Sequence, residues 1–580
     1  MLKTSEWQET MLYHAVQPCG PLPTVCDEEG IYPYESFCET AKRPNLRNFR
    51  MIAIENEWLK ATVCPDLGGK VHSILDKASG REILFHSGSV RPVRILPRMA
   101  FISGGIEVSF PIAHTPVQIE SVHALTSQVE DRLYIWCGER EVRYGMHWTV
   151  EYSLGHDDRY LTQRTTFVNP TSEAHAWMSW SNAALPARPD SEFHFPAGHV
   201  LRHADVLEEI DWEDRDYRLS EFDRMQGFFW KSADCNAFGM FTPSLGSGLY
   251  HIADQAETPG IKLWLYGIGE HEKWAHLTAA QKESYVEIQA GPLLEQADNK
   301  KLQPGARHVH TEFWLPSTEP LNIRELGLPN PQLVDIELIP MFDWVPRSNS
   351  ASWIQLVDAF QRGTLDRVPI PPDAEDCCWP PSGIELLGEA LQWAAEQHGD
   401  KNKPLWSYYL GVWLAGKGRF DESIPILQTA GLDGSYALLG RLLRVIKQDF
   451  EASREAFNRI SSTAWSLHPQ VFIERDITLA HYGSAAYDER EQWFERVESL
   501  QEDGLVERKA SFLFDKGAIH EAKTILDHHH FENVHQRYER SRLWNQITES
   551  LDCAEAPIPG HLGEDDLAAY GAYRVLAKKS

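Results

Sequence analysis

Long apolar runs and clustered cysteines are both missing from this sequence of 580 residues. No stretch approaches 18 uninterrupted apolar residues, so we expect no membrane-spanning helix. The first 20 residues contain no long apolar stretch either, and we expect no secretory signal there. The nine cysteines are scattered without a CxxC pair, a pattern that favours reduced thiols in a cytoplasmic protein.

Basic residues are few relative to acidic ones, with Lys+Arg at 55, Asp+Glu at 84 and a net charge of −29. Nucleic acids and anionic membrane surfaces bind basic patches, so this balance argues against both as partners. A phosphate-binding loop and a GxSxG motif are also absent. His308 and His310 share a predicted strand face but have no identified third ligand, so we expect neither a metal nor a cofactor.

Tryptophan, in contrast, is abundant at 20 residues. Most of these rings belong in hydrophobic cores, but a pyranose also stacks its apolar face on such rings. The count is therefore compatible with a small carbohydrate ligand.

Residues 45–320 show a succession of short strands. Turn signals, such as those at residues 66–69 and 169–171, separate runs of alternating apolar residues, a pattern typical of an all-β sandwich. Residues 1–44 are interpreted as an N-terminal extension with strands. Eleven prolines lie between Pro316 and Pro381, so residues 321–381 are interpreted as a connector, with a short helix around residues 352–360.

From residue 382 to 580 the apolar pattern becomes helical. Leu-Gly pairs that end at Gly411 and Gly440 are each followed by a Phe-x-x-Ser segment, at residues 420–423 and 450–453, with an offset of 29 to 30 residues. A third copy is predicted at residues 512–522. The pattern resembles tetratricopeptide helix pairs, and because such repeats often bind partners we expect a homodimer through them.

Four segments between residues 45 and 316 carry a family resemblance through their order and spacing. They are residues 56–77, with a Gly-Gly turn between two strands; 102–107, Ile-Ser-Gly-Gly-Ile-Glu; 168–182; and 285–314, with Tyr-Val-Glu-Ile-Gln, a Pro-Gly turn and a final strand. In this order they resemble the galactose mutarotase-like superfamily, which contains aldose 1-epimerases and glycoside hydrolases. With its tail, the chain also resembles a bacterial domain family of unassigned function that carries tetratricopeptide-like repeats.

The resemblance implies an antiparallel β-supersandwich followed by an all-α, tetratricopeptide-like region, with Glu287 as catalytic base. Two positions depart from the mutarotase pattern. The His-Gly-Gly turn is Ser-Gly-Gly at residues 103–105, and Trp180 occupies the place of the acidic histidine. Because this removes the usual acid, we predict that Glu107 and Glu287 form a carboxyl pair for glycoside hydrolysis, with Glu107 as acid and Glu287 as base or nucleophile.

Substrate-binding residues are expected around this pair. They are Arg98, His114, Trp180, Asn182, Trp264, Trp274, His276 and Gln289. Three hypotheses follow: a glycoside hydrolase that cleaves a small oligosaccharide or glycoside, an aldose epimerase in which His114 replaces the missing acid, and a non-catalytic sugar-binding protein whose helical repeats recruit a partner. Two opposed carboxylates favour the first, a lone glutamate beside histidines the second, and a site with neither the third.

Overall fold

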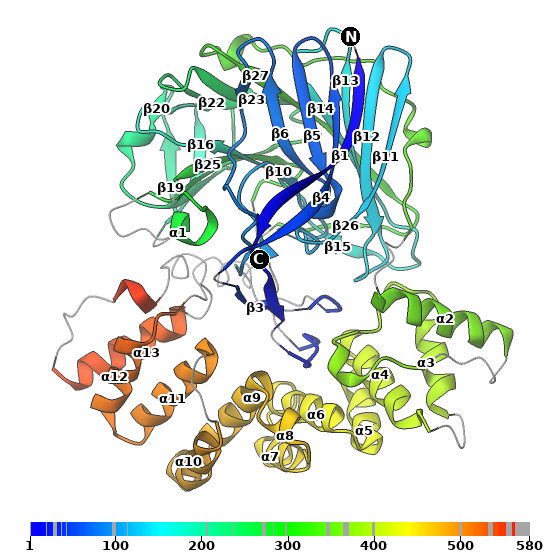
Figure 1. Ribbon diagram of the computed structural model, residues 1–580, viewed down its shortest axis with the longest axis vertical. Coiled ribbons are helices and arrows are strands. Elements are labelled where there is room, and N and C mark those ends of the chain that lie inside the picture. Colours follow the sequence, from blue (N-terminus) through cyan, green and yellow to red (C-terminus); the bar gives the residue numbers. More distant parts are fainter. Residues whose placement is uncertain are drawn as a thin grey trace.

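The chain has two parts in sequence order, strands first and helices second (Figure 1). The computed structural model describes residues 2–562 apart from residues 19, 27–31, 36, 42, 95–99, 113, 205–206, 236, 269–273, 282, 296–297, 344–347, 364–369, 397–400, 498–501, 532–536 and 553–558. Strands fill the N-terminal part up to Ser317, and most of the helices follow it. This order confirms the predicted fold class. None of the described helices has an apolar stretch long enough to cross a lipid bilayer.

Two large antiparallel sheets form the N-terminal part. In spatial order, the 12-stranded sheet contains β1 (Lys3–Tyr13), β4 (Asn45–Glu55), β5 (Leu59–Cys64), β6 (Lys70–Asp76), β10 (Ile106–Val108), β16 (Ser181–Pro186), β25 (Tyr285–Gly291), β24 (Gly260–Tyr266), β21 (Gln226–Trp230), β18 (Gly198–His203) and β19 (Leu207–Trp212), with β7 (Arg81–Glu82) paired to β6. The 9-stranded sheet contains β11 (His123–Val129), β12 (Arg132–Arg140), β13 (His147–Gly155), β14 (Leu161–Val168), β27 (Arg307–Ser317), β23 (Ser247–Ala253), β22 (Ala237–Thr242), β17 (Glu192–His194) and β20 (Tyr217–Arg218). Short pairs join β2 (Val16–Pro18) to β3 (Phe37–Thr40), β8 (Val93–Arg94) to β9 (Ala100–Phe101), and β15 (His175–Trp177) to β26 (Lys300–Leu302).

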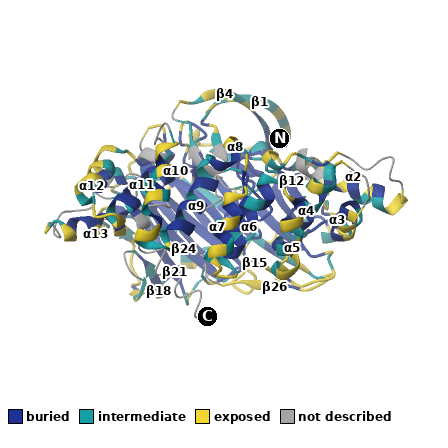
Figure 2. Ribbon diagram, turned by 90° about the horizontal axis from the view of Figure 1, so that it is seen from below, coloured by how far each residue is buried: buried dark blue, intermediate teal, exposed yellow. Residues whose placement is uncertain are grey.

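The main hydrophobic core contains side chains of both sheets. Val286 and Ile288 of β25 belong to the same buried cluster as Trp148 and Val150 of β13. Because successive side chains of a strand point to opposite faces, Glu287 lies on the other face of the 12-stranded sheet, away from this core. β25 is therefore buried on both faces, and the strands at the centre of Figure 2 are mostly dark blue.

A polar network within the sandwich joins the two sheets. Glu312 of β27 accepts hydrogen bonds from Gln163 of β14 (2.7 Å) and Ser181 of β16 (2.6 Å), and its other oxygen lies 3.1 Å from His251 Nε2. Burial alone would raise the pKa of Glu312, but hydrogen bonds with His251 and His310 hold that pKa well below its usual value. The network therefore keeps a charged carboxylate fully paired inside the core.

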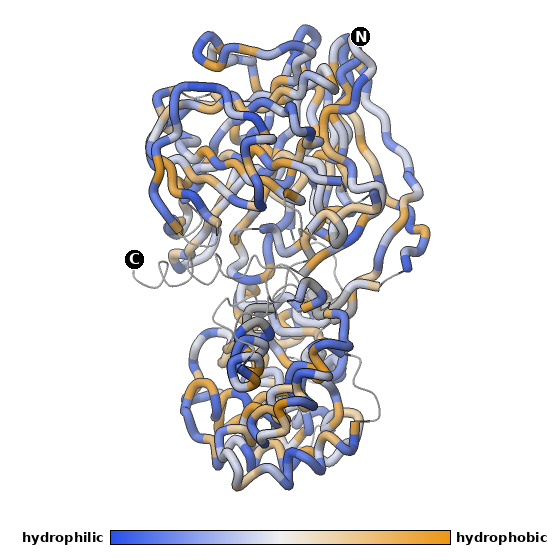
Figure 3. Tube along the Cα trace, turned by 90° about the vertical axis from the view of Figure 1, so that its left-hand side faces the viewer, coloured by the Kyte–Doolittle hydropathy of each residue, from blue (hydrophilic) through white to orange (hydrophobic). Residues whose placement is uncertain are grey.

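The helices form an arc below the sheets in the view of Figure 1, and a side view separates the two parts (Figure 3). Short α1 (Trp274–Thr278) lies within the strand-rich part. The arc contains α2 (Ser348–Arg362), α3 (Leu387–Glu396), α4 (Lys403–Gly416), α5 (Phe420–Ala430), α6 (Asp433–Val445), α7 (Phe450–Asn458), α8 (Thr463–Ser466), α9 (Pro469–Ala480), α10 (Tyr487–Glu495), α11 (Asp503–Asp515), α12 (Ile519–His528) and α13 (Arg537–Ser550). The short helix predicted around residues 352–360 corresponds to α2.

The predicted sequence repeat is also a repeat in space. Ser423 Oγ of α5 donates a hydrogen bond to the Gly411 carbonyl of α4 at 2.7 Å. Ser453 Oγ of α7 donates one to the Gly440 carbonyl of α6, also at 2.7 Å. Each glycine lets its helix approach the next one closely, and the third predicted copy, at residues 512–522, falls on the pair α11 and α12.

The N-terminal segment connects the two parts of the molecule. β1 lies at the edge of the 12-stranded sheet, where it pairs with β4. Further along, Leu22 and Tyr32 are buried in the main hydrophobic cluster of the helices. The Leu22 amide donates to Gln470 Oε1 at 2.8 Å, and the Tyr32 hydroxyl donates to the Pro380 carbonyl at 2.5 Å. The helical core is therefore completed by residues from the other end of the chain.

Replacement of Gly440 by alanine tests the helix packing. A Cβ at Gly440 would lie 2.7 Å from the Phe457 ring, so the gain of about 1 kcal/mol in helix propensity is outweighed by overpacking that costs about 1–3 kcal/mol. We expect Gly440→Ala to lower the free energy of unfolding by up to about 2 kcal/mol in urea titrations. Gly327→Ala is the control, because no atom lies within 4 Å of its Cβ. An unchanged or higher stability of Gly440→Ala would contradict this packing.

Candidate functional site

One face of the 12-stranded sheet carries a row of charged and amide side chains, and we call it the site face. Antiparallel pairing places Glu107 opposite Asn182 and Asn182 opposite Gln289. Gln289 in turn lies opposite Lys262, and Lys70 extends the row through the pairing of β6 with β10. Residues directly opposite each other in a sheet share a face, so these five side chains are neighbours across five strands. All five are buried.

A second row lies one pleat along the same strands. Ala184 of β16 lies opposite Glu287, and Glu287 lies opposite Trp264 of β24. Glu287 is two residues from Gln289 on β25, so both point to the site face. The structure therefore brings together five of the predicted site residues on this face: Glu107, Asn182, Trp264, Glu287 and Gln289.

Glu107 is held in place as a carboxylate. Its Oε2 lies 2.9 Å from His114 Nδ1 and accepts a hydrogen bond from Asn182 Nδ2 at 3.3 Å, while its Oε1 accepts one from the Thr115 amide at 2.7 Å. Burial alone would raise the pKa of Glu107, but the charge of His114 and these hydrogen bonds bring it below the usual value. The lowered pKa favours the carboxylate form, which suits Glu107 as a base or as a positioning residue better than the role of acid that the sequence predicts.

Glu287 is in the opposite electrostatic state. Burial, together with the nearby Glu107 charge, raises the pKa of Glu287 to about 7 against the lowering effect of His114. Gln289 Nε2 donates a hydrogen bond of 2.6 Å to Glu287 Oε2. Glu287 therefore exchanges its proton near neutral pH, as a general acid or base requires.

Two lysines lie near these carboxyl groups. Burial lowers the pKa of Lys262 to about 7 and also lowers the pKa of Lys70, while the charges of Glu107 and Glu287 act in the opposite direction on both. The Lys262 ammonium lies 5.0 Å from the ring centroid of Trp180, within cation–π distance. Trp180 is fully buried, so it supports Lys262 and is not exposed to a ligand.

Stacked aromatic rings adjoin Glu287 on the site face. Tyr266 stacks on Trp264 (centroids 5.7 Å apart), on Trp274 (5.4 Å) and on Tyr285 (4.8 Å). The Trp274 indole also donates a hydrogen bond to the Tyr285 hydroxyl at 2.8 Å. Trp264 and Trp274 thus belong to one aromatic cluster, as their predicted grouping requires. Trp274 is only 1% exposed, so its ring contacts other rings, whereas Trp264 is 8% exposed.

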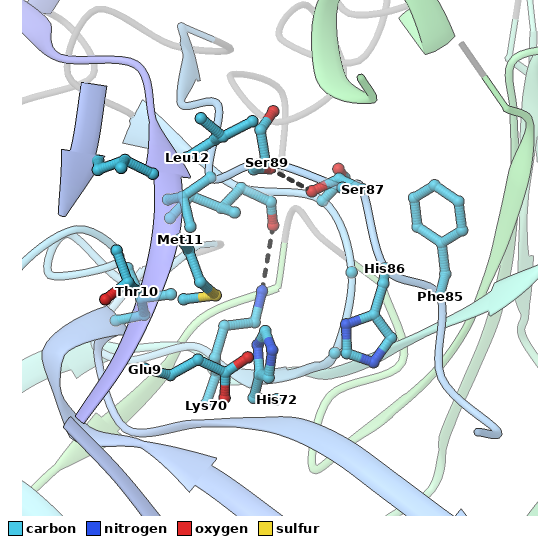
Figure 4. A pocket seen from close by; sticks show the side chains of 18 residues that line it. Glu9, Thr10, Met11, Leu12, Lys70, His72, Phe85, His86, Ser87 and Ser89 are labelled. Atoms are coloured by element: carbon cyan, nitrogen blue, oxygen red, sulfur yellow. Dashed lines mark hydrogen bonds between the residues drawn. The ribbon is translucent and has the colours of Figure 1, made fainter. Parts of the chain in front are cut away.

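A cavity of about 360 Å³ borders the row on the side of β6. Figure 4 shows Lys70 and His72 of β6 beside Glu9 and Met11 of β1. The imidazoles of His72 and His86 meet edge to face with centroids 4.8 Å apart. Burial lowers the pKa of His72 to about 3, so this ring is neutral.

Sequence reasoning missed Lys70, Lys262 and His72, although one signal was present. Lys70 and His72 alternate directly after a Gly-Gly turn, as side chains of one strand face do. Lys262 gave no such signal, because only the pairing of β24 with β25 places it beside Gln289. Arg98 and the side chain of His276 lie outside the part of the chain that the structure describes. Among the described residues, no three His, Cys, Asp or Glu side chains cluster as metal ligands.

The raised pKa of Glu287 predicts a pH-dependent loss of stability. The folded state binds this proton more tightly than the unfolded state, whose carboxyl titrates near 4.5, so stability falls as pH rises from about 4.5 through 7. Glu287→Gln lacks this loss, and between pH 5 and 8 it should lose about 2–3 kcal/mol less stability than the wild type in urea titrations. Glu319→Gln, on an exposed segment, is the control. Equal losses in wild type and Glu287→Gln would contradict the raised pKa.

Comparisons with known proteins agree with this two-part structure. The family model described as domain of unknown function DUF5107 matches residues 26–317, and a model of a C-terminal domain matches residues 353–547. The crystal structure of a TPR-domain containing protein from Parabacteroides distasonis is 46% identical over 97% of this chain and 98% of that chain, with a TM-score of 0.94.

Matches to the N-terminal part include galactose mutarotase-like proteins, the superfamily that the sequence resembles. One from Clostridium acetobutylicum is 13% identical over 46% of this chain and 95% of that chain, with a TM-score of 0.36. One from Lactobacillus casei is 11% identical over 46% of this chain and 99% of that chain, with a TM-score of 0.35. On the match of residues 26–317 and the 46% identity to the Parabacteroides protein, the chain belongs to the DUF5107 family.

Proposed function

We propose that the protein is a carbohydrate-active enzyme of the aldose epimerase type, with Glu287 and His114 as its proton-transferring pair. One observation carries this proposal: the ion pair of Glu107 with His114, at 2.9 Å, lies close enough to Glu287 for the His114 charge to affect the Glu287 pKa. The site face thus holds a carboxyl group that titrates near pH 7 beside a carboxylate-bound imidazole. These are a base and an acid of the kind that sugar ring opening needs.

His114 replaces the acid that the mutarotase pattern lacks here. Its Nδ1 is bound to Glu107, so Nε2 is the ring atom that can exchange a proton with a substrate. A carboxylate in this position orients the imidazole and stabilises its protonated form. Glu107 is therefore a positioning residue, and His114 supplies the proton.

The reaction follows from these two roles. Glu287 as carboxylate removes the proton from the anomeric hydroxyl, and His114 as imidazolium protonates the ring oxygen. The bond between the anomeric carbon and the ring oxygen breaks, which leaves an open-chain aldehyde. Rotation about the next carbon–carbon bond and the reverse proton transfers close the ring as the other anomer, so no atom is gained or lost.

Glycoside hydrolysis is the second candidate, because the pKa values of Glu107 and Glu287 are shifted in opposite directions, as in acid and nucleophile pairs. In this case Glu287 would be the acid and Glu107 the base or nucleophile, the reverse of the roles that the sequence predicts. The hydrogen bonds of Glu107 argue against it. Both of its oxygens already accept hydrogen bonds or bind His114, which leaves them poorly placed to attack carbon or activate water.

Anomer equilibration of freshly dissolved aldoses tests the proposal, and polarimetry or proton NMR measures it. The wild type should accelerate equilibration, and Glu287→Gln and His114→Gln should each lower kcat by about 10²- to 10⁴-fold, because each removes a proton-transferring group. Glu319→Gln, on the exposed segment after β27, should retain wild-type rates. Cleavage of aryl glycosides that is lost in both Glu107→Gln and Glu287→Gln would instead favour the hydrolase.

The pH profile gives a separate prediction for the same reaction. The base form of Glu287 is needed, and its pKa is raised to about 7, so the rising limb of the kcat/KM profile on the acid side should have its midpoint near 7. Profiles of kcat/KM between pH 5 and 9 report the free enzyme. A midpoint near 4.5, the ordinary value of a glutamate, would contradict the assignment of Glu287 as base.

A further inference from the structure

The cavity beside Lys70 is not used by the proton-transferring pair. The described residues that line it come mainly from β1, from β6 and from the segments at residues 85–90 and 102–105, with Leu46 and Leu67 in addition, and they do not include His114 or Glu287. Its volume of about 360 Å³ is typical of a pocket for a small organic molecule.

The cavity nevertheless adjoins the site face at Lys70. Lys70 lines it and stands next to Glu107 in the row of charged and amide side chains. Gly105, which also lines the cavity, immediately precedes β10 and is hydrogen-bonded on both sides. Its amide donates to the Phe85 carbonyl, and its carbonyl accepts from the Ala184 amide. From β6 to β25 there are three strand spacings, about 14 Å, a span that two linked sugar rings bridge.

A glycine pair shapes the boundary between the cavity and the site. Gly104 and Gly105 have φ values of +91° and +72°, which side-chain-bearing residues rarely adopt. A Cβ at Gly105 would lie 2.3 Å from the Val71 carbonyl oxygen and 2.9 Å from Lys70 Cε. The glycines therefore let this turn lie directly against the stem of Lys70, so that only that side chain separates the cavity from Glu107.

The lining suits a neutral polyol and not an ion. Lys70 and Glu9 carry opposite charges, and His72 is neutral because burial lowers its pKa to about 3. Ser89 is only 6% exposed, and its hydroxyl has no hydrogen-bond partner in the structure. A buried hydroxyl without a partner costs about 1–3 kcal/mol, so a ligand hydroxyl here would be stabilised. Apolar side chains, Phe85 among them, complete the mixed surface that a sugar ring prefers.

We infer that this cavity binds a second sugar ring, so that the substrate is a disaccharide or larger oligosaccharide. The inference rests on the proposed function and specifies the substrate class of the same site. One ring lies at Glu287 and His114, where protons are transferred, and the linked ring lies between β1 and β6. A hydroxyl of the second ring takes the hydrogen bond that the Ser89 hydroxyl leaves open.

Calorimetry with glucose, maltose, cellobiose and lactose tests this inference by binding alone. At least one disaccharide should bind the wild type about tenfold or more tightly than glucose, the effect of one or two added hydrogen bonds. Leu12→Trp should remove this preference by filling the cavity, and because Leu12 is 41% exposed on β1 the substitution should leave folding intact. Ser89→Ala should weaken disaccharide binding several-fold. None of these changes should alter the affinity for glucose.

Thr258→Val is the matched control for Ser89→Ala, because it also removes a buried hydroxyl without a partner, outside the cavity. It should leave disaccharide binding unchanged. Equal affinity of the wild type for glucose and all three disaccharides, or a preference that survives Leu12→Trp, would overturn the inference. If the wild type does not accelerate anomer equilibration but still prefers a disaccharide over glucose, the epimerase proposal is overturned and the second subsite remains.

Discussion

The strand register of the 12-stranded sheet is the constraint on which the site depends, because it sets buried charges of opposite sign beside one another. Lys70, Glu107 and Lys262 lie in one row with two amides, and Glu287 lies one pleat away. A buried charge is costly unless a partner compensates it, so none of these side chains is tolerable alone. Their mutual compensation favours the carboxylate form of Glu107, while burial brings the pKa values of Glu287 and Lys262 to about 7. The burial that destabilises these charged side chains is thus also what shifts the pKa values of Glu287 and Lys262 towards neutral pH.

Local sequence signals were sufficient for the fold. The alternation of strands, the helical period after residue 382 and the spacing of Gly411 and Gly440 all arise from side-chain periodicity, which is local. Glu287 could be selected through the resemblance to the galactose mutarotase-like superfamily, and Glu107 because it follows a Gly-Gly turn. The positions of the strands and of the paired helices could therefore be predicted without knowing which distant residues are in contact.

The electrostatic roles, in contrast, required the register between distant strands. Lys262 acquires its role only because β24 pairs with β25, and the sequence offers no local sign of that pairing. The acid and base roles of the two glutamates could not be assigned from the sequence, because burial and the contact of Glu107 with His114 shift their pKa values in opposite directions. Trp180, which the sequence suggests as a substrate-binding residue, lies beside Lys262 in a fully buried position.

The N-terminal segment packs against both parts of the molecule, so the strand-rich part and the helical part are not independent modules. β1 lines the cavity, and only nine residues after its end Leu22 is already packed in the helical core. The order of domains along the chain is thus not their order in space, and a cut between the strands and the helices would leave Leu22 and Tyr32 without their packing partners. Exchange of the helical repeats for another tail would therefore also require changes at Leu22 and Tyr32, so the two parts of the chain are structurally coupled.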